Sequence, residues 1–373
     1  MRERRYTYAV STILSEIGTR IAPIIAFLLA ITVVARGCDL IGLFDLAATQ
    51  AARQAKGRVL MLWLLLVGLA VACTAVLSLD TTAVLLTPIV IIVAKRVRIP
   101  LMALVFTTLW LANTASLFLP VSNLTNLLAA DKMRQWGMGT SGYLGMLAPP
   151  AIVATLATIV VIAILFRTDL LGSYDSEVSF NDHDRVAVVI GGVTCVGMAI
   201  AFVVGSPPWL AAGIGAAIIV ATVAWRYPRK LGYLQPPWLM ALGLLALFLV
   251  VEVARLWDLD ALIATVAGQG DGWGALVRLS TVSAVSANLI NNLPAYLALE
   301  SAASSPVRLA AILIGVNCGP LVTLWGSLAT LLWKERCQAG EVSVSAGKIA
   351  GYGLICASVV VISATTALWV ANA

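Results

Sequence analysis

Charge is scarce in this sequence: Asp, Glu, Lys and Arg make up 11% of its 373 residues, and only one histidine is present. Hydrophobic residues make up 61%, and the mean hydropathy is +0.97. A chain this apolar is expected to be a polytopic membrane protein, with the lipid bilayer as its surroundings. The net charge of +6 then indicates basic cytoplasmic loops, and no nucleic-acid partner is expected.

Motifs of metal sites and of enzymes are missing too. The six cysteines stand singly, without a Cys-x-x-Cys pair, so we expect no metal site and mostly reduced, lipid-buried thiols. The single histidine, His183, lies in a polar linker beside Asp182 and Asp184, where it is interpreted as a solvated loop residue. No His-Glu-x-x-His motif, paired-aspartate motif or serine nucleophile with a base occurs, so we expect no enzyme and no catalytic residue.

Long apolar runs are plentiful. Several reach or approach the roughly 20 residues that a spanning helix needs, and we expect an all-α membrane protein with about ten membrane segments. These runs are Val59–Leu77, 151–166, 186–204, 209–225, 239–253 and 349–370. The basic N-terminus is not followed by a small-residue cleavage site, so a cleaved signal peptide is not expected.

Polar residues interrupt the apolar sequence at 79–82 and again at 113–126. An acid, several asparagines, hydroxyls and a proline stand there in almost wholly apolar surroundings. An aspartate in hydrocarbon costs roughly 2.5 to 3.5 kcal/mol on insertion scales, so such groups usually mark a substrate or ion path. We interpret these residues as half of a transport site.

The other half is predicted by an internal repeat. The charged stretch 167–185, expected to be a cytoplasmic linker, divides the chain into comparable repeats at 1–166 and 186–373. Breaks at 77–82 and 288–294 correspond, and 113–128 matches 317–332 without a gap at a constant offset of 204. Helices expected at 186–204 and 209–225 have no counterpart ahead of Ile21, so the first repeat apparently lacks two leading helices.

Basic residues predict opposite orientations for the two repeats, because Lys and Arg collect on the cytoplasmic side. They flank the first break on both sides, at 53–58 and 95–98, so we expect a re-entrant hairpin with cytoplasmic ends. Acidic residues surround the second break, so its hairpin is expected to open outside. Lys132, Arg134 and the basic N-terminus oppose this assignment. Two inverted repeats, each with a hairpin and a broken helix, are typical of secondary transporters.

The candidate substrate-binding or ion-binding residues are the polar side chains at these breaks. They are Ser78, Asp80, Thr81, Asn113, Ser122, Asn123, Asn126, Asn288, Asn291, Asn292, Asn317 and Ser327. Structural alternatives remain open for several of them: a helix cap or buried structural acid for Asp80, helix-end hydrogen bonding for Asn291 and Asn292, and interhelical hydrogen bonds for Ser122, Asn123, Asn126 and Ser327. Cys318, beside the second broken helix, is interpreted as an ordinary buried thiol.

At these residues the sequence resembles the arsenite/antimonite efflux permeases (ArsB-type) of the ion transporter superfamily. The resemblance extends from about residue 15 onward, and its most specific pieces are 86–91, 114–117, 121–124, 291–294 and 326–333. It implies an inner-membrane, multi-pass carrier. The family's usual Asn-Asp-Gly stands here as Leu79-Asp80-Thr81, its two broken-helix aspartates stand as Asn113 and Asn317, and its usual lysine stands as Leu321.

The leading hypothesis is export of trivalent arsenic or antimony hydroxide by alternating access, with proton antiport through Asp80. Its support in the sequence is an inferred core with hydrogen-bonding groups but no Arg or Lys, which suits the neutral hydroxide As(OH)3. A sodium-coupled organic-anion symporter and a sodium/proton antiporter of the same superfamily are the alternatives. No cofactor is expected beyond proton or sodium as coupling ion, and the candidate protein partners are a second copy of the chain (a homodimer) and a partner ATPase.

Overall fold

The computed structural model describes residues 20–175, 184–255 and 265–373. Within these ranges every regular element is helical, and the one extended feature is an isolated bridge between Arg58 and Ser173. The all-α prediction is therefore confirmed. His183, Asp182, the acidic positions 258 and 260 and the basic N-terminal residues lie outside the described residues.

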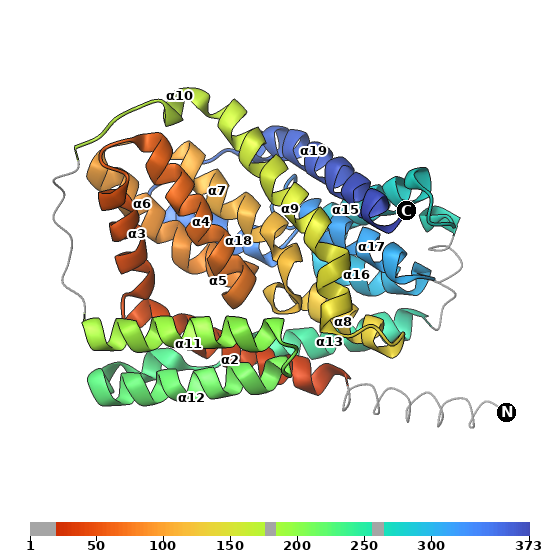
Figure 1. Ribbon diagram of the computed structural model, residues 1–373, viewed down its shortest axis with the longest axis horizontal. Coiled ribbons are helices and arrows are strands. Elements are labelled where there is room, and N and C mark those ends of the chain that lie inside the picture. Colours follow the sequence, from red (N-terminus) through yellow and green to blue (C-terminus); the bar gives the residue numbers. More distant parts are fainter. Residues whose placement is uncertain (1–19, 176–183, 256–264) are drawn as a thin grey trace.

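The helices follow the expected apolar runs (Figure 1). In chain order they are α2 (Ala22–Leu40), α3 (Leu43–Gln54), α4 (Val59–Leu77), α5 (Leu79–Thr81), α6 (Thr87–Val97), α7 (Met102–Thr114), α8 (Leu124–Gln135), α9 (Thr140–Leu165), α10 (Arg167–Leu170), α11 (Arg185–Val203), α12 (Pro208–Arg226), α13 (Trp238–Arg255), α15 (Trp273–Ile290), α16 (Asn292–Leu299), α17 (Pro306–Cys318), α18 (Leu328–Ala339) and α19 (Ala346–Asn372). A π-helical turn, η2 (Thr82–Leu86), joins α5 to α6.

Seven helices of the described ranges are long and apolar enough to cross a membrane. They are Ala22–Leu40, Val59–Leu77, Thr140–Leu165, Arg185–Val203, Pro208–Arg226, Pro228–Val250 and Ala346–Asn372. Helix α4 begins and ends at the residues of the predicted run. Two shorter apolar helices, Met102–Phe118 and Pro306–Cys318, are the helices that break at the polar residues.

The helices form two bodies (Figure 1). Helices α2, α11, α12 and α13 form a lower layer, in which α2 packs along α12. Gly37 permits this contact, because a Cβ there would lie 2.0 Å from Cγ2 of Ile219. The upper body contains both broken helices and is held by contacts of α9 with α19 and of α15 with α17. At Gly315 of α17 a Cβ would lie 2.3 Å from the carbonyl oxygen of Ser280, so this glycine allows α15 and α17 to approach closely.

The elements of the upper body occur in pairs. Helices α7 and α17 both have 13 residues and start 204 residues apart, and α8 and α18 both have 12 residues and also start 204 residues apart. The predicted offset therefore corresponds to equal helix lengths. The inverted orientation of the two repeats and the division at 167–185 stay predictions.

The first hairpin folds back on itself. Helix α4 descends to a break at Ser78, and α5, η2 and α6 return. Helices α4 and α6 both contact α3, which places the outer ends of the hairpin on one side of the molecule. In the second hairpin α15 and α16 meet at Asn291 and contact each other.

Site-directed labelling tests the hairpin. We expect Lys56→Cys and Lys95→Cys, in a chain whose native cysteines have been replaced, to react with an impermeant maleimide from the same membrane face. Both side chains are exposed at the outer ends of the hairpin. Asp271→Cys, which precedes the second hairpin, should react from the opposite face. Labelling of positions 56 and 95 from opposite faces would contradict a re-entrant hairpin.

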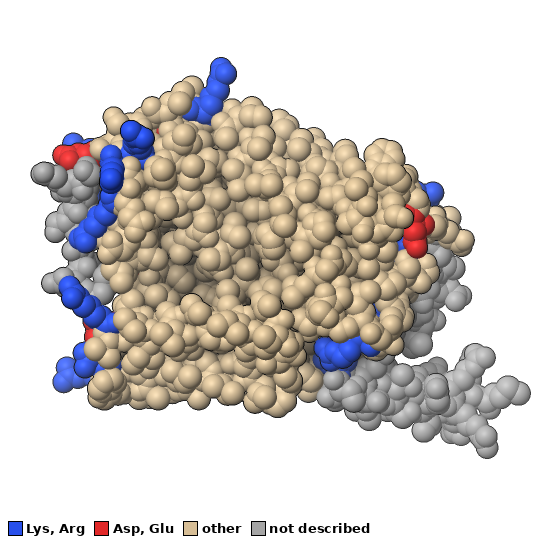
Figure 2. Space-filling model, in the orientation of Figure 1, with Lys and Arg blue, Asp and Glu red and all other residues tan. Residues whose placement is uncertain are grey.

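Charged side chains lie at the margins of the molecule, and the broad middle of the face in Figure 2 carries none. At one margin Nε of Arg226 donates to the Asp184 carboxylate at 2.6 Å, which joins the end of α12 to the start of α11. This hydrogen bond lowers the pKa of Asp184, which also caps α11 by accepting from the N–H of Val186 at 3.1 Å. The uncharged middle is the part of this surface suited to lipid.

Candidate functional site

The first hairpin breaks at Ser78 in an unusual backbone conformation. Its φ of 104° and ψ of 161° lie in a region that is almost restricted to glycine, and such strain costs about 1–3 kcal/mol. The hydroxyl of Ser78 accepts from the N–H of Thr81 at 3.4 Å, and the Thr81 hydroxyl donates to the carbonyl of Leu77 at 2.9 Å. These hydrogen bonds stabilise the non-helical backbone at Ser78, and Asp80 lies in the first turn of α5, which follows it.

The second hairpin breaks at Asn291 in nearly the same conformation, with φ 105° and ψ 152°. The side-chain amide of Asn291 donates to the carbonyl of Trp325 at 2.9 Å, and the N–H of Asn292 donates to the carbonyl of Gly326 at 2.8 Å. The hairpin tip is therefore fastened to the loop that precedes α18. Strain of this kind, present at both breaks, is typical of functional sites.

The two broken helices restart at polar caps. The Asn123 side chain accepts from the N–H of Thr125 at 3.3 Å at the start of α8, and the Ser327 hydroxyl accepts from the N–H of Thr330 at 3.2 Å at the start of α18. Caps of this kind satisfy N–H groups that the interrupted helix leaves free. The N-terminal ends of α8 and α18 carry partial positive charge.

Three asparagines connect α8 and α17 in a buried cluster. The Asn317 side-chain oxygen accepts from the Asn123 amide at 2.7 Å and from the Thr125 hydroxyl at 2.9 Å, while its amide donates to the Asn126 oxygen at 2.6 Å. Asn126 also donates to the carbonyl of Ser116 at 2.6 Å. Asn126 and Asn317 are fully buried. They hold the broken helices together, which is the interhelical alternative foreseen for Asn126.

Loss of this cluster is expected to destabilise the protein. Asn317→Ala would leave the Asn123 amide without its partner and would leave the Thr125 hydroxyl and the Asn126 oxygen with only their mutual contact at 3.5 Å, and each unpaired buried group costs about 1–3 kcal/mol. We expect a clearly lower midpoint of thermal unfolding in detergent. Asn372→Ala, which removes an exposed asparagine from α19, serves as the control and should leave the midpoint unchanged. Equal midpoints for the two variants would contradict a structural role for Asn317.

Several other predicted residues support the breaks from behind. The Ser122 hydroxyl donates to the carbonyl of Ala75 at 2.9 Å, and the Asn288 amide donates to the carbonyl of Gly319 at 2.8 Å. Asn113 is fully buried, and its amide donates to the carbonyl of Leu109 at 3.0 Å. A cavity of about 740 Å³ lies near the breaks, but none of these three, nor Asn126, Asn317 or Ser327, is among the described residues that line it.

The cavity of about 740 Å³ lies between the two bodies, and both hairpin breaks open into it. The predicted residues that line this central cavity are Ser78, Asp80, Thr81, Asn123, Asn291 and Asn292. The first residues of α5, α8, α16 and α18 all border it, so four positive helix ends converge there. Apolar residues of α2 and α13 form the opposite wall.

Asp80 is the acid among the residues lining the central cavity. Its Oδ1 is buried and has no hydrogen-bond partner within the described part of the chain. An unpaired carboxyl in an apolar environment favours its neutral, protonated form. The buried Oδ1 of Asp80 is thus free of hydrogen bonds from the described residues and is the acidic acceptor of this cavity.

The expectation of a core without Arg or Lys is wrong, because two arginines lie at the central cavity. Arg36 of α2 and Arg336 of α18 both line the central cavity. Leu328, Leu332 and Arg336 are spaced one helical turn apart, so a single stripe of α18 runs from the polar break to the guanidinium. Nε of Arg336 is buried and unpartnered among the described residues. Arg336 lies two turns beyond the break before α18, so residues next to the breaks in the sequence give no indication of it.

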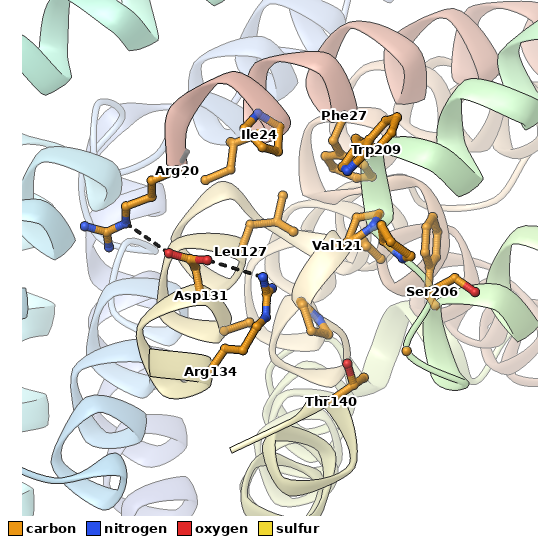
Figure 3. Close-up of a pocket in the computed structure, with 17 residues that line it drawn as sticks. Arg20, Ile24, Phe27, Val121, Leu127, Asp131, Arg134, Thr140, Ser206 and Trp209 are labelled. Carbon is orange, nitrogen blue, oxygen red and sulfur yellow. Dashed lines mark ion pairs between the residues drawn. The ribbon is translucent and has the colours of Figure 1, made fainter. Parts of the chain in front are cut away.

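A second cavity of about 370 Å³ lies beyond the central one (Figure 3). Phe27 and Val121 line both cavities and are almost fully buried, so they separate them. Arg20, Asp131 and Arg134 form an ion-pair cluster at the edge of the second cavity, with Nε of Arg20 3.6 Å and Nη1 of Arg134 3.4 Å from the Asp131 carboxylate.

The same cluster fastens α2 to the second hairpin. Arg20 also forms a buried ion pair with Glu300, and the Tyr296 hydroxyl donates to Glu300 at 2.8 Å. Removing one partner of a buried ion pair lowers the stability of a protein by roughly 3–5 kcal/mol, because the other charge is then left uncompensated. The lower layer and the upper body are thus held together firmly at this end.

Among the described residues no group of three or more His, Cys, Asp or Glu side chains is placed to hold a metal ion. The polar groups of the central cavity are instead hydroxyls, amides, one carboxyl and two guanidinium groups. This arrangement can bind a small polar solute through hydrogen bonds and move a proton at Asp80.

Comparison with known proteins adds the family relationships. The profile of a family described as "Citrate transporter" (CitMHS) matches residues 7–316. The "Arsenical pump membrane protein" of Escherichia coli K12 is 30% identical over 356 residues, which cover 88% of this chain and 82% of the relative. The protein of the same name from Yersinia enterocolitica is 30% identical over 359 residues with the same coverage.

A solved structure has a similar fold. The YdaH transporter of Alcanivorax borkumensis superimposes with a TM-score of 0.60 over 98% of this chain and 88% of that chain, at 15% sequence identity. At this identity the similarity concerns the fold alone.

Proposed function

The chain belongs to the citrate transporter (CitMHS) family and is a membrane transporter rather than an enzyme, and we propose that it is a secondary carrier of the inner membrane that exports arsenite and antimonite. The observation that carries this proposal is the chemistry of the central cavity at its two breaks. Hydroxyls, amides and helix N-termini converge there around a single carboxyl. Such groups suit a small neutral hydroxide, and the curated relatives are named as arsenical pumps.

Alternating access is proposed as the transport cycle. The two cavities share the lining side chains Phe27 and Val121, which lie between them. The Arg20 cluster closes the end beyond the second cavity by joining α2 to α8 and to the residues after α16. A movement of the upper body against α2 would break these ion pairs and open that end while the central cavity closes.

Proton antiport is proposed as the coupling. A substrate hydroxide and a proton would compete for the pocket around Asp80, because the carboxyl is the titratable group at the breaks. Proton loading on the outside and release to the cytoplasm would then drive export. The proposal needs no ATPase and no second copy of the chain, although both remain candidate partners.

A sodium-coupled organic-anion symporter is the second candidate, with a sodium/proton antiporter as a further alternative. The observation that favours an anion is Arg336, whose side chain lines the cavity and whose Nε has no hydrogen-bond partner among the described residues. A guanidinium binds carboxylates in a bidentate manner, whereas a neutral hydroxide does not require it.

Transport in inside-out vesicles distinguishes these candidates. Vesicles holding the purified chain are offered arsenite, sodium or a dicarboxylate, each with and without a pH gradient. We expect arsenite to accumulate only with the gradient, and without added ATP. Accumulation of the dicarboxylate with sodium, lost in Arg336→Gln, would establish the symporter instead.

Thiol chemistry is not expected to carry the substrate. Cys318 is buried within α17 and is not among the residues that line the central cavity. We therefore expect Cys318→Ser to confer arsenite resistance like the unaltered chain, measured as growth of a sensitive strain at increasing arsenite with expression confirmed by immunoblot. Asn292→Ala, a change in the cavity wall, serves as the sensitive comparison. Loss of resistance in a well-expressed Cys318→Ser protein would show that a thiolate binds the substrate.

A further inference from the structure

Two cysteines far apart in the sequence face each other between α2 and α11. Sγ of Cys38 lies 3.6 Å from Sγ of Cys195, and both thiols are free. Neither residue is among the described residues that line the two cavities. The thiol pair therefore stands apart from the proposed transport site.

A glycine brings the two helices close enough for this contact. Gly191 precedes Cys195 by one turn of α11 and lies on the same face. A Cβ on Gly191 would lie 2.5 Å from Cδ1 of Ile41 and 3.9 Å from Sγ of Cys38. Any larger residue would push α11 away from α2, so the local sequence is compatible with close approach of the sulfurs.

The separation of the sulfurs suits one soft trivalent centre. With bonds as long as the roughly 2.3 Å of zinc thiolates, and an angle between a right angle and a tetrahedral one, a central atom puts two sulfurs roughly 3.3 to 3.8 Å apart. The observed 3.6 Å lies within this range. Zinc would require two more protein ligands, and no group of three or more ligating side chains occurs in the described ranges. A trivalent arsenical forms three bonds, two to the thiolates and one to a group that it already carries.

We propose that Cys38 and Cys195 form a dithiol site for trivalent arsenicals and antimonials, separate from the transport cavity. In the binding step two As–O bonds of the hydrated arsenical break and two As–S bonds form. The two thiol protons leave with the two hydroxyl groups as water. No oxidant or reductant is needed, since arsenic stays trivalent and sulfur stays at the thiol level.

Access to the pair is provided from the outer face of α11. Cys195 is partly exposed, whereas Cys38 is fully buried behind it. Its neighbours Val193 and Val196 are 67% and 61% exposed on an apolar surface that is suited to lipid. A neutral, lipid-soluble arsenical can reach Cys195 first and then close onto Cys38. Bound arsenic would tie α11 to α2, the helix that lines both cavities.

Intact-mass spectrometry tests the site without a transport assay. The reduced full-length protein in detergent is treated with phenylarsine oxide, which bridges paired thiols, and excess reagent is removed. We expect one adduct on the unaltered chain that is removed by a dithiol but resists a monothiol. The adduct should fall to background in Cys38→Ser and in Cys195→Ser and persist in the matched controls Cys337→Ser and Cys356→Ser.

A second measurement uses the unaltered protein, so it does not depend on the folding of a variant. Phenylarsine oxide should protect Cys195 from alkylation by a maleimide, as located by peptide mass spectrometry. The proposal is wrong if the unaltered chain takes up no adduct, if Cys195 stays unprotected, or if the adduct persists in a folded Cys195→Ser protein. These outcomes are independent of whether the carrier exports arsenite.

Discussion

Replacing Asp80 with asparagine is expected to reduce export driven by a pH gradient to the level of protein-free vesicles. The amide has nearly the shape of the protonated carboxyl but cannot release a proton. Oδ1 of Asp80 is buried and unpartnered among the described residues, so the substitution removes no hydrogen bond there. Protein amount and unfolding midpoint should therefore remain close to those of the unaltered chain.

The Asp80→Asn variant should distinguish net export, which needs proton movement, from exchange of substrate, which does not. Exchange of labelled arsenite between equal concentrations needs the cavity to change access but needs no net proton movement. We expect Asp80→Asn to retain part of this exchange while losing accumulation. The measurement is uptake into inside-out vesicles, with and without a gradient, alongside exchange at equal concentrations. Asp271→Asn, an exposed acid before α15, is the matched control and should behave like the unaltered chain.

The sign of the pH effect follows from the direction of proton flow. The interior of an inside-out vesicle corresponds to the outside of the cell, so an acidic interior supplies protons to Asp80 from that side and should drive arsenite inward. Reversing the gradient should abolish accumulation. If Asp80→Asn still concentrates arsenite with an acidic interior, Asp80 does not couple the proton and its role is structural.

Replacing Asn291 with glycine is expected to remove transport without loss of stability. Asn291 has φ 105° and ψ 152°, where a non-glycine residue costs about 1–3 kcal/mol. Glycine relieves this strain and loses the side-chain hydrogen bond to the carbonyl of Trp325, worth about 0.5–1.5 kcal/mol. The N–H of Leu293, from which Asn291 also accepts, keeps its hydrogen bond to the Asn292 side chain. The unfolding midpoint should therefore stay level or rise. Transport should fall to near background, because the amide in the cavity wall is gone and the hairpin tip is no longer tied to the loop before α18.

A matched alanine variant separates the backbone effect from the amide effect. Asn291→Ala loses the same hydrogen bond but keeps the strain, so its unfolding midpoint should lie below that of Asn291→Gly. Asn292→Ala should likewise impair transport more than folding, because its backbone N–H still donates to the carbonyl of Gly326. Arsenite uptake and thermal unfolding are measured on the same preparations. Normal uptake by Asn291→Gly would show that the second break is not part of the substrate site.

The sequence by itself determined the helices and their pairing. A run such as Val59–Leu77 becomes a helix of the same bounds because apolar residues in lipid must satisfy every backbone group within their own segment. The offset of 204 residues likewise corresponds to the equal lengths of α7 and α17, since a helix ends where local polar residues supply the caps. The polar breaks at Ser78 and Asn291 were recognisable for the same local reason.

The tertiary structure decided which polar residues face the cavity and which face one another. Asn123 lines the cavity and also donates to Asn317, whereas Asn126, three residues on, does not line the cavity and bonds to Asn317, which joins α8 to α17. Arg336 enters the cavity wall two turns beyond the break, and Cys38 meets Cys195 across 157 residues of chain. Such contacts depend on how α2, α11 and α18 pack. Helices distant in the sequence pack where their surfaces have complementary shapes, at positions such as Gly37 and Gly191. A local sequence pattern does not encode this complementarity, because it depends on both helices.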